Sequence, residues 1–139
     1  MQPPTGSDRY AVPSRVEQLG SAGQRRLEAS RTAIVGVGAL GGTIAQQLVR
    51  SGVGSVLLID DDCAELGNLH RQILYTEADA AQGRAKVDAA VERLRAANSS
   101  VAIEGVQTPE GLERDAIRAR ECAGGAAGEQ VEPRMVRRR

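Results

Sequence analysis

Three glycines at close spacing constrain this chain more than any other feature. They limit both the conformation of the backbone there and the kind of ligand that can approach it. Gly36, Gly38 and Gly41 match the pattern G-x-G-x-x-G. The apolar, β-branched run at 32–36 predicts a buried strand, and helical spacing at 39–50 predicts a helix directly after it. In this setting the glycines permit a tight turn and let a phosphate approach the backbone. The alternative is a glycine turn that serves packing alone.

The next segments continue the alternation of strand and helix. Strands are predicted at 55–60 and 101–106, and a helix is predicted at 84–97. The order strand, helix, strand, helix, strand is typical of a Rossmann-like α/β fold with a parallel sheet. We therefore expect the first half of such a fold, with three strands.

Two further helical segments are expected outside this repeat. Residues 14–27 predict two N-terminal helices, broken by Gly20 and Gly23. The connection after the second strand is predicted to be mostly loop, with one short helix at 68–74.

The two ends of the chain differ from the middle. Residues 1–8 are predicted to form a flexible tail, and 9–106 an incomplete nucleotide-binding domain. Apolar positions become sparse after that, so 107–139 are predicted to hold a weak helix at 110–121 followed by a disordered tail.

The composition excludes several classes of partner. The 139 residues carry 18 basic and 18 acidic side chains and contain neither Phe nor Trp, which argues against binding to nucleic acid. The uncharged stretch at 32–49 holds glycines and glutamines that a lipid-facing helix would not accommodate, so no membrane association is expected. Two widely separated cysteines, Cys63 and Cys122, and the lack of a signal peptide predict a cytoplasmic protein.

An acidic residue follows the second predicted strand. Parallel strands end at one edge of a sheet, so Asp60 is expected near the glycine loop, where its carboxylate is placed to accept ribose hydroxyl groups. From these residues alone the nucleotide can be NAD, FAD or ATP.

Further motifs narrow this choice. The segments concerned are D-D-D-x-x-x-x-G-N-L-H-R-Q at 60–72, G-R-A-K at 83–86, R-Y at 9–10, G-S-A-G-Q-R-R-L at 20–27 and L-R-A-A-N at 94–98. In order, and nearly in spacing, they resemble the motifs of the ThiF/HesA/MoeB family of ubiquitin-activating-like adenylyltransferases. The resemblance covers about residues 9–106.

The resemblance implies ATP as cofactor and a reaction at its α-phosphate, which the C-terminal carboxylate of a ubiquitin-like sulfur carrier ending in Gly-Gly attacks. It implies two catalytic residues, Arg71 over the triphosphate and Lys86 at the phosphates; Lys86 is the only lysine in the chain. Asn68 would hydrogen-bond a phosphate oxygen, and Asp60 the ribose. The implied ATP-binding residues are Gly36, Gly38, Ala39, Gly41, Asp60, Asp62, Gly67, Asn68, Leu69, Arg71 and Lys86.

The sequence also departs from the family pattern. Val12 and Pro13 replace an Arg-Gln pair whose arginine reaches ATP in the neighbouring subunit, and Gly67 replaces a serine. No D-N pair, whose aspartate holds Mg²⁺ in the family, follows Val106. The family implies Mg²⁺, but we predict no metal ligand in this chain.

The run Asp60-Asp61-Asp62 is not predicted to hold a metal, because adjacent side chains on an extended segment point apart. We favour Asp60 as the ribose ligand and Asp62 as a supporting acid. His70 occupies a variable position of the family motif and is not expected to be catalytic.

Three functions compete at this point. The first is an adenylyltransferase-type domain that pairs as a homodimer and activates a sulfur carrier, here in truncated form. The second is an inactive remnant in which 107–139 replace the authentic second half. The third is a fragment of an NAD(P)-binding oxidoreductase, which shares the glycine loop but gives no account of Lys86.

Overall fold

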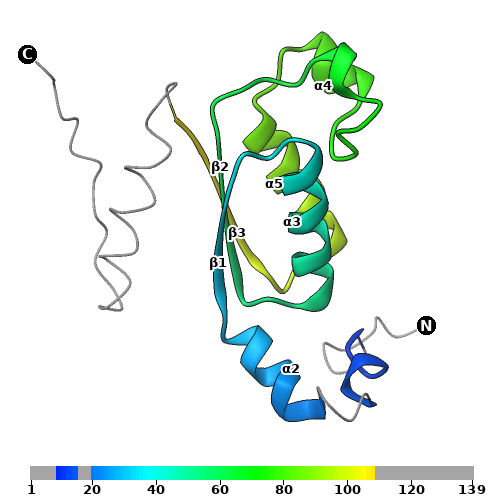
Figure 1. The fold of residues 1–139 in the computed structure, drawn as a ribbon, viewed down its shortest axis with the longest axis vertical. Coiled ribbons are helices and arrows are strands. Elements are labelled where there is room, and N and C mark those ends of the chain that lie inside the picture. Colours follow the sequence, from blue (N-terminus) through cyan, green and yellow to red (C-terminus); the bar gives the residue numbers. More distant parts are fainter. Residues whose placement is uncertain (1–8, 16–19, 109–139) are drawn as a thin grey trace, which may run out of the picture.

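The computed structural model describes residues 9–15 and 20–108 as one parallel sheet with helices (Figure 1). The strands are β1 (Arg31–Val35), β2 (Ser55–Asp60) and β3 (Ala102–Gln107), hydrogen-bonded in the order β1-β2-β3. The predicted Rossmann-like fold class is confirmed, and the strand predicted at 55–60 matches β2 at both ends.

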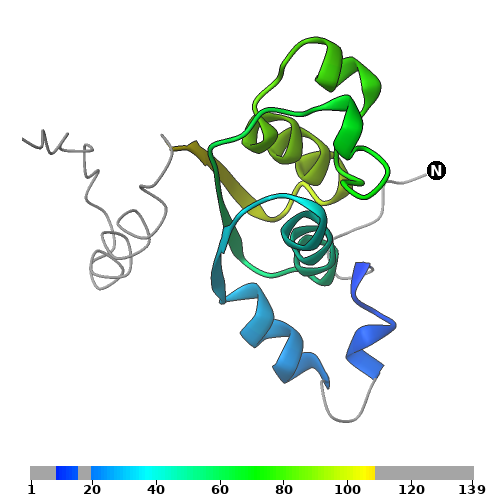
Figure 2. The same ribbon diagram turned by 45° about the horizontal axis from the view of Figure 1, so that its top comes forward.

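Two long helices cover one face of the sheet. These are α3 (Ala39–Ser51) and α5 (Lys86–Ala97), which follow β1 and precede β3 and lie on the same side in both views (Figures 1 and 2). The core between helices and sheet consists of aliphatic side chains, of which Val49, Leu58 and Leu94 are almost completely buried. Among the described helices, none is both long and apolar enough to cross a membrane.

The register of the sheet brings the carboxyl ends of the strands together. Val35 of β1 lies opposite Ile59 of β2, which lies opposite Val106 of β3. The glycine loop after β1 therefore lies beside Asp60 at the end of β2, as the order of strands predicted.

The N-terminal segment meets the opposite end of the sheet. It contains a 3₁₀ turn, η1 (Pro13–Arg15), and the helix α2 (Gly20–Glu28). The predicted break at Gly23 is wrong: α2 continues through this residue, which is buried.

A buried asparagine attaches this segment to the domain. Asn98 donates from Nδ2 to the Tyr10 hydroxyl and to the Val49 carbonyl, both at 2.8 Å. Tyr10 in turn packs against Gly52, where an added Cβ would come within 2.3 Å of the phenol ring. The R-Y and L-x-x-x-N motifs thus meet at this contact.

The connection between β2 and α5 differs from the prediction. It contains a 3₁₀ turn, η2 (Leu66–Asn68), and the short helix α4 (Glu77–Ala81), and the helix predicted at 68–74 is wrong. The backbone there forms separate turns, in which the Gln72 amide donates to the Asn68 carbonyl and the Tyr75 amide to the Gln72 carbonyl, and not a continuous helical ladder. The predicted tails and the helix at 110–121 lie outside the described residues.

One ion-pair network joins α4 to α5. Asp79 is buried, and its carboxylate accepts hydrogen bonds from the Thr76 amide (2.8 Å) and hydroxyl (2.7 Å). The first of these, with the Asp79 amide donating back to the Thr76 hydroxyl oxygen at 3.4 Å, forms a capping box at the start of α4. Arg93 of α5 donates to the same carboxylate at 2.5 Å, and Arg84 lies at 3.4 Å. Burial raises the pKa of Asp79, but the hydrogen bonds from Thr76 and Arg93 outweigh it and lower the pKa to about 2.

We expect this network to make stability depend on pH in acid. The pKa of Asp79 is about 2 when folded and 3.8 ordinarily, so its contribution is complete above about pH 4 and is lost as the pH falls towards 2. Asp79→Asn should lower the free energy of unfolding by about 2 kcal/mol at pH 7, and this difference should shrink below pH 4 in urea titrations. Glu77→Gln, at an exposed position of the same helix, is the control. A difference that stays constant from pH 7 to pH 2 would contradict the assignment.

Candidate functional site

The glycine loop, residues 36–41, joins β1 to α3, and two of its glycines are required by the protein itself. Gly36 has a φ of 81°, a conformation that side chains other than glycine rarely adopt. At Gly41 an added Cβ would lie 1.8 Å from the Gly36 carbonyl oxygen, so close packing excludes a side chain.

Gly38 is different. Its φ is −75°, and the nearest atom to an added Cβ is Nε2 of Gln72 at 3.5 Å, an ordinary van der Waals distance. The packing of the described residues therefore leaves room for a methyl group at Gly38. Contacts among the described residues do not account for glycine at this position.

Two hydrogen bonds to the Val37 peptide hold the loop in place. The Val37 amide donates to Oδ2 of Asp60, and the Tyr75 hydroxyl donates to the Val37 carbonyl, each at 2.5 Å. Val37 itself is completely buried. Burial raises the pKa of the Tyr75 phenol, and the nearby Asp60 carboxylate raises it further, so the hydroxyl remains a donor.

The first turn of α3 is open to an anion. Gly38 is its N-cap and supplies no side-chain acceptor, so the first amide groups of the helix have no capping partner. These amides and the positive end of the helix dipole favour a negatively charged group beside Gly38.

Lys86, the first residue of α5, lies beside the acidic segment that follows β2. Its amide donates to the Asp62 carbonyl at 3.0 Å, and an isolated bridge pairs Cys63 with Ala85. The Lys86 Nζ is paired with Asp62 Oδ2 at 2.5 Å, and its side chain is 5% exposed. The pairing orients the Lys86 ammonium although it is buried.

Arg71 and Asn68 lie together in the connection between η2 and α4. Arg71 donates from Nη2 to Asn68 Oδ1 at 2.7 Å, and Asn68 Nδ2 donates to Glu65 at 2.9 Å. His70 contacts the second guanidinium nitrogen of Arg71 at 3.3 Å and the Gly67 carbonyl at 3.0 Å. Arg71 forms no salt bridge with a described acid and is exposed, so its charge is available to a ligand.

The structure thus groups the residues predicted for the site into three sets. The glycine loop, with Ala39 at the start of α3, contacts Asp60; Lys86 contacts Asp62; and Asn68 contacts Arg71. Leu69 is partly buried and packs against the core, so its side chain has a structural contact. Gly67 has open space around it.

The acidic run after β2 is the only described group whose carboxylates lie close enough for a metal. The oxygens of Asp60, Asp61 and Asp62 come within 4.8 Å of one another, so the prediction that these side chains point apart is wrong. The run leaves β2 at Asp60, and strand alternation does not extend past that residue. Asp62 is paired with Lys86, whose ammonium repels a cation at this cluster, so the donor set does not fit a metal ion.

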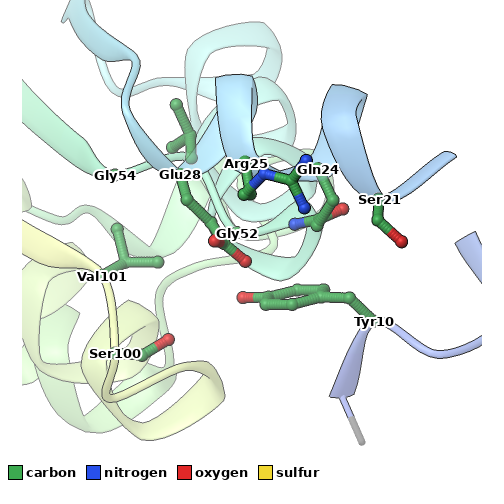
Figure 3. Close-up of a pocket in the computed structure, with 10 residues that line it drawn as sticks. Tyr10, Ser21, Gln24, Arg25, Glu28, Gly52, Gly54, Ser100 and Val101 are labelled. Atoms are coloured by element: carbon green, nitrogen blue, oxygen red, sulfur yellow. The ribbon is translucent and has the colours of Figure 1, made fainter. Parts of the chain in front are cut away.

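A cavity of about 570 Å³ lies elsewhere, at the amino ends of the strands (Figure 3). It lies between α2 and the turns that precede β2 and β3. Tyr10, Gln24, Gly52 and Ser100 line it, and none of the residues predicted for the site does. The Gln24 amide there donates to the Ser51 carbonyl at 3.0 Å.

Sequence reasoning missed two residues that contact the glycine loop. Tyr75 holds the Val37 carbonyl, and Gln72 lies against Gly38. Tyr75 is one of two tyrosines in a chain without Phe or Trp, and Gln72 ends the N-L-x-R-Q motif. These signals were visible, but the contacts depend on how the connection folds back.

The fold and this loop define a Rossmann-like α/β domain with a glycine-rich turn at a helix N-terminus. The ThiF family model matches residues 10–120, and the chain belongs to this family. It is 45% identical over 98 residues to the sulfur carrier protein ThiS adenylyltransferase of Bacillus subtilis, covering 70% of this chain and 29% of that protein. It is 42% identical over 97 residues to the sulfur carrier protein adenylyltransferase of Thermus thermophilus, covering 70% and 35%.

Solved structures agree. The structure of TcdA (CsdL) matches with a TM-score of 0.67 and 27% identity, covering 73% of this chain and 39% of that one. The structure of E. coli MccB with ATP matches with a TM-score of 0.60 and 31% identity, covering 63% and 26%. The chain spans about a third of the length of these curated relatives.

We expect substitution by alanine to have different effects on stability at Gly38 and at Gly41. Gly41→Ala should lower the free energy of unfolding by about 3 kcal/mol or more, because its Cβ would collide with the Gly36 carbonyl. Gly38→Ala should change it by less than about 1 kcal/mol, because its Cβ meets only ordinary contacts. Urea unfolding measures both, and equal losses would contradict the claim that Gly38 is not required for packing.

Proposed function

We propose that this chain binds ATP at its glycine loop, as the nucleotide-binding part of an adenylyltransferase that acts on a ubiquitin-like sulfur carrier. The observation that carries the proposal is the space at Gly38, which packing does not explain and which adjoins the open N-terminus of α3. A phosphate fits both features. The relatives named above support the choice of ATP and of the reaction class.

In this proposal two cations bind the remaining phosphates. An ammonium has three donors, and Lys86 uses one on Asp62, so two remain for phosphate oxygens. The Arg71 guanidinium is held at one edge by Asn68, which leaves its other donors for the triphosphate. Asp60 accepts one amide on each oxygen, so each oxygen keeps a lone pair for a ribose hydroxyl.

ATP supplies the leaving group of the reaction. An oxygen of the carrier's C-terminal carboxylate bonds to the α-phosphorus, and the bond from that phosphorus to the bridging β-oxygen breaks, which releases pyrophosphate. The residues of this chain position the phosphates and offset the charge that grows on the leaving group. Arg71 and Lys86 have this role.

The partner in this proposal is a sulfur carrier whose C-terminus ends in Gly-Gly, and the active assembly is a homodimer. The names of the relatives support the carrier. The described part of the chain does not offer a Mg²⁺ site, because the Lys86 ammonium paired with Asp62 repels a cation there, so no step of this proposal uses a metal ion.

Exchange of labelled pyrophosphate into ATP tests this proposal. With a Gly-Gly sulfur carrier present we expect exchange by the wild-type chain. Arg71→Ala should lower the rate by about 100-fold, while the Kd for ATP from calorimetry should rise by less than about fivefold. This split follows because Arg71 acts mainly on charge that develops in the transition state.

Arg50→Ala is the matched control, because Arg50 is an exposed arginine in the last turn of α3, away from the glycine loop. It should change neither quantity. ATP binding without any exchange would refute the enzymatic proposal and favour a chain that binds nucleotide without catalysis. Tighter binding of NAD than of ATP would favour an oxidoreductase fragment.

A further inference from the structure

We propose that Gln72 is a further nucleotide-binding residue, whose side-chain amide donates to the phosphate seated against Gly38. The proposal rests on the proposed function, because it names a contact within the same ATP site. Gln72 is not among the residues predicted for the site from the sequence.

The first observation is an unmet hydrogen-bonding requirement. Gln72 is 6% exposed, and its Oε1 is buried without a hydrogen-bond partner in the described structure. The only other such side-chain atom among the described residues is the Thr108 hydroxyl. Neither end of this carboxamide has a hydrogen-bond partner among the described residues, so no hydrogen bond within that part of the chain accounts for a glutamine here.

The second observation is where the amide lies. Its Nε2 is 3.5 Å from the position of a Cβ on Gly38, a loop glycine that neither a positive φ nor a close contact among the described residues requires. A group that occupies this room contacts the Gly38 backbone and the Gln72 amide together. The room beside Gly38 and the unpartnered Gln72 side-chain amide therefore adjoin one another and form one candidate site.

The chemistry of this position favours a phosphate. The uncapped N-terminus of α3 adjoins Gly38 and attracts an anion. The Gln72 carboxamide presents its Nε2, an NH₂ donor, to Gly38, and such a donor suits the oxygens of a phosphate. An uncharged donor adds a hydrogen bond there without competing for the Asp60 carboxylate.

The backbone around Gln72 is fixed well enough to aim the side chain. The backbone N–H of Gln72 donates to the Asn68 carbonyl at 3.0 Å, and the backbone carbonyl of Gln72 accepts from the Tyr75 N–H at 3.2 Å. Leu74 lies 3.2 Å from a Cβ position on Gly42, in the first turns of α3. These contacts hold the segment against the helix before any ligand binds.

Calorimetric titration of the full chain with ATP, AMP and adenosine tests the proposal. Gln72→Met keeps the length of the side chain and removes the amide. We expect the Kd for ATP and for AMP to rise about five- to tenfold, and that for adenosine to change by less than about twofold. Gln72→Glu should weaken ATP and AMP more than Gln72→Met does, because its carboxylate repels the phosphate.

Thermal unfolding separates this role from a structural one. Gln72→Met should not lower Tm, because the wild-type amide makes no hydrogen bond that would be lost. Gln24→Met is the matched control: this buried glutamine donates to the Ser51 carbonyl at the other end of the sheet. It should lower Tm and leave the Kd for ATP unchanged.

Each other result overturns the proposal. If the wild-type chain binds ATP and Gln72→Met binds it equally well, this inference fails and the proposed function stands. A loss that extends equally to adenosine, or that accompanies a fall in Tm like that of Gln24→Met, would assign Gln72 to another contact or to packing. If the wild-type chain binds none of the three compounds, the proposed function fails together with this inference.

Discussion

The Val37 peptide is the point on which the site depends. Its amide donates to Asp60 at the end of β2, and its carbonyl accepts from Tyr75 just before α4. These two residues therefore fix the loop after β1. Both bonds are buried, where hydrogen bonds are strong and costly to break. They orient the glycine loop so that Gly38 and the first turn of α3 face outward.

The same connection after β2 serves both structure and chemistry. Tyr75 holds the glycine loop and Gln72 borders it, whereas Arg71 points away from the core and is exposed. Alternating buried and exposed side chains make this possible in a segment that is not helical. Lys86 is positioned separately, through its pairing with Asp62 at the start of α5.

Sequence patterns predicted the fold better than the site. The strands and long helices follow from apolar periodicity, which tertiary packing reinforces, and β2 has the predicted bounds. The helix predicted at 68–74 was wrong because the burial of Gln72, Leu74 and Tyr75 resembles that of a helical face, whereas the backbone hydrogen bonds of this segment form separate turns that side-chain spacing does not reveal. The contacts around Gly38 likewise come from residues distant in sequence. The glycine motif therefore could not show that packing requires Gly41 but not Gly38.

The glycine loop should be held in the conformation that binds nucleotide even when no nucleotide is present. Hydrogen exchange of the Val37 amide in the nucleotide-free chain, followed by NMR, tests it most directly. We expect the Val37 amide to be about as well protected against exchange as the Leu58 amide in the middle of β2, because Val37 donates to buried Asp60. Exchange of Val37 at the rate of an open loop, while Leu58 stays protected, would contradict the claim.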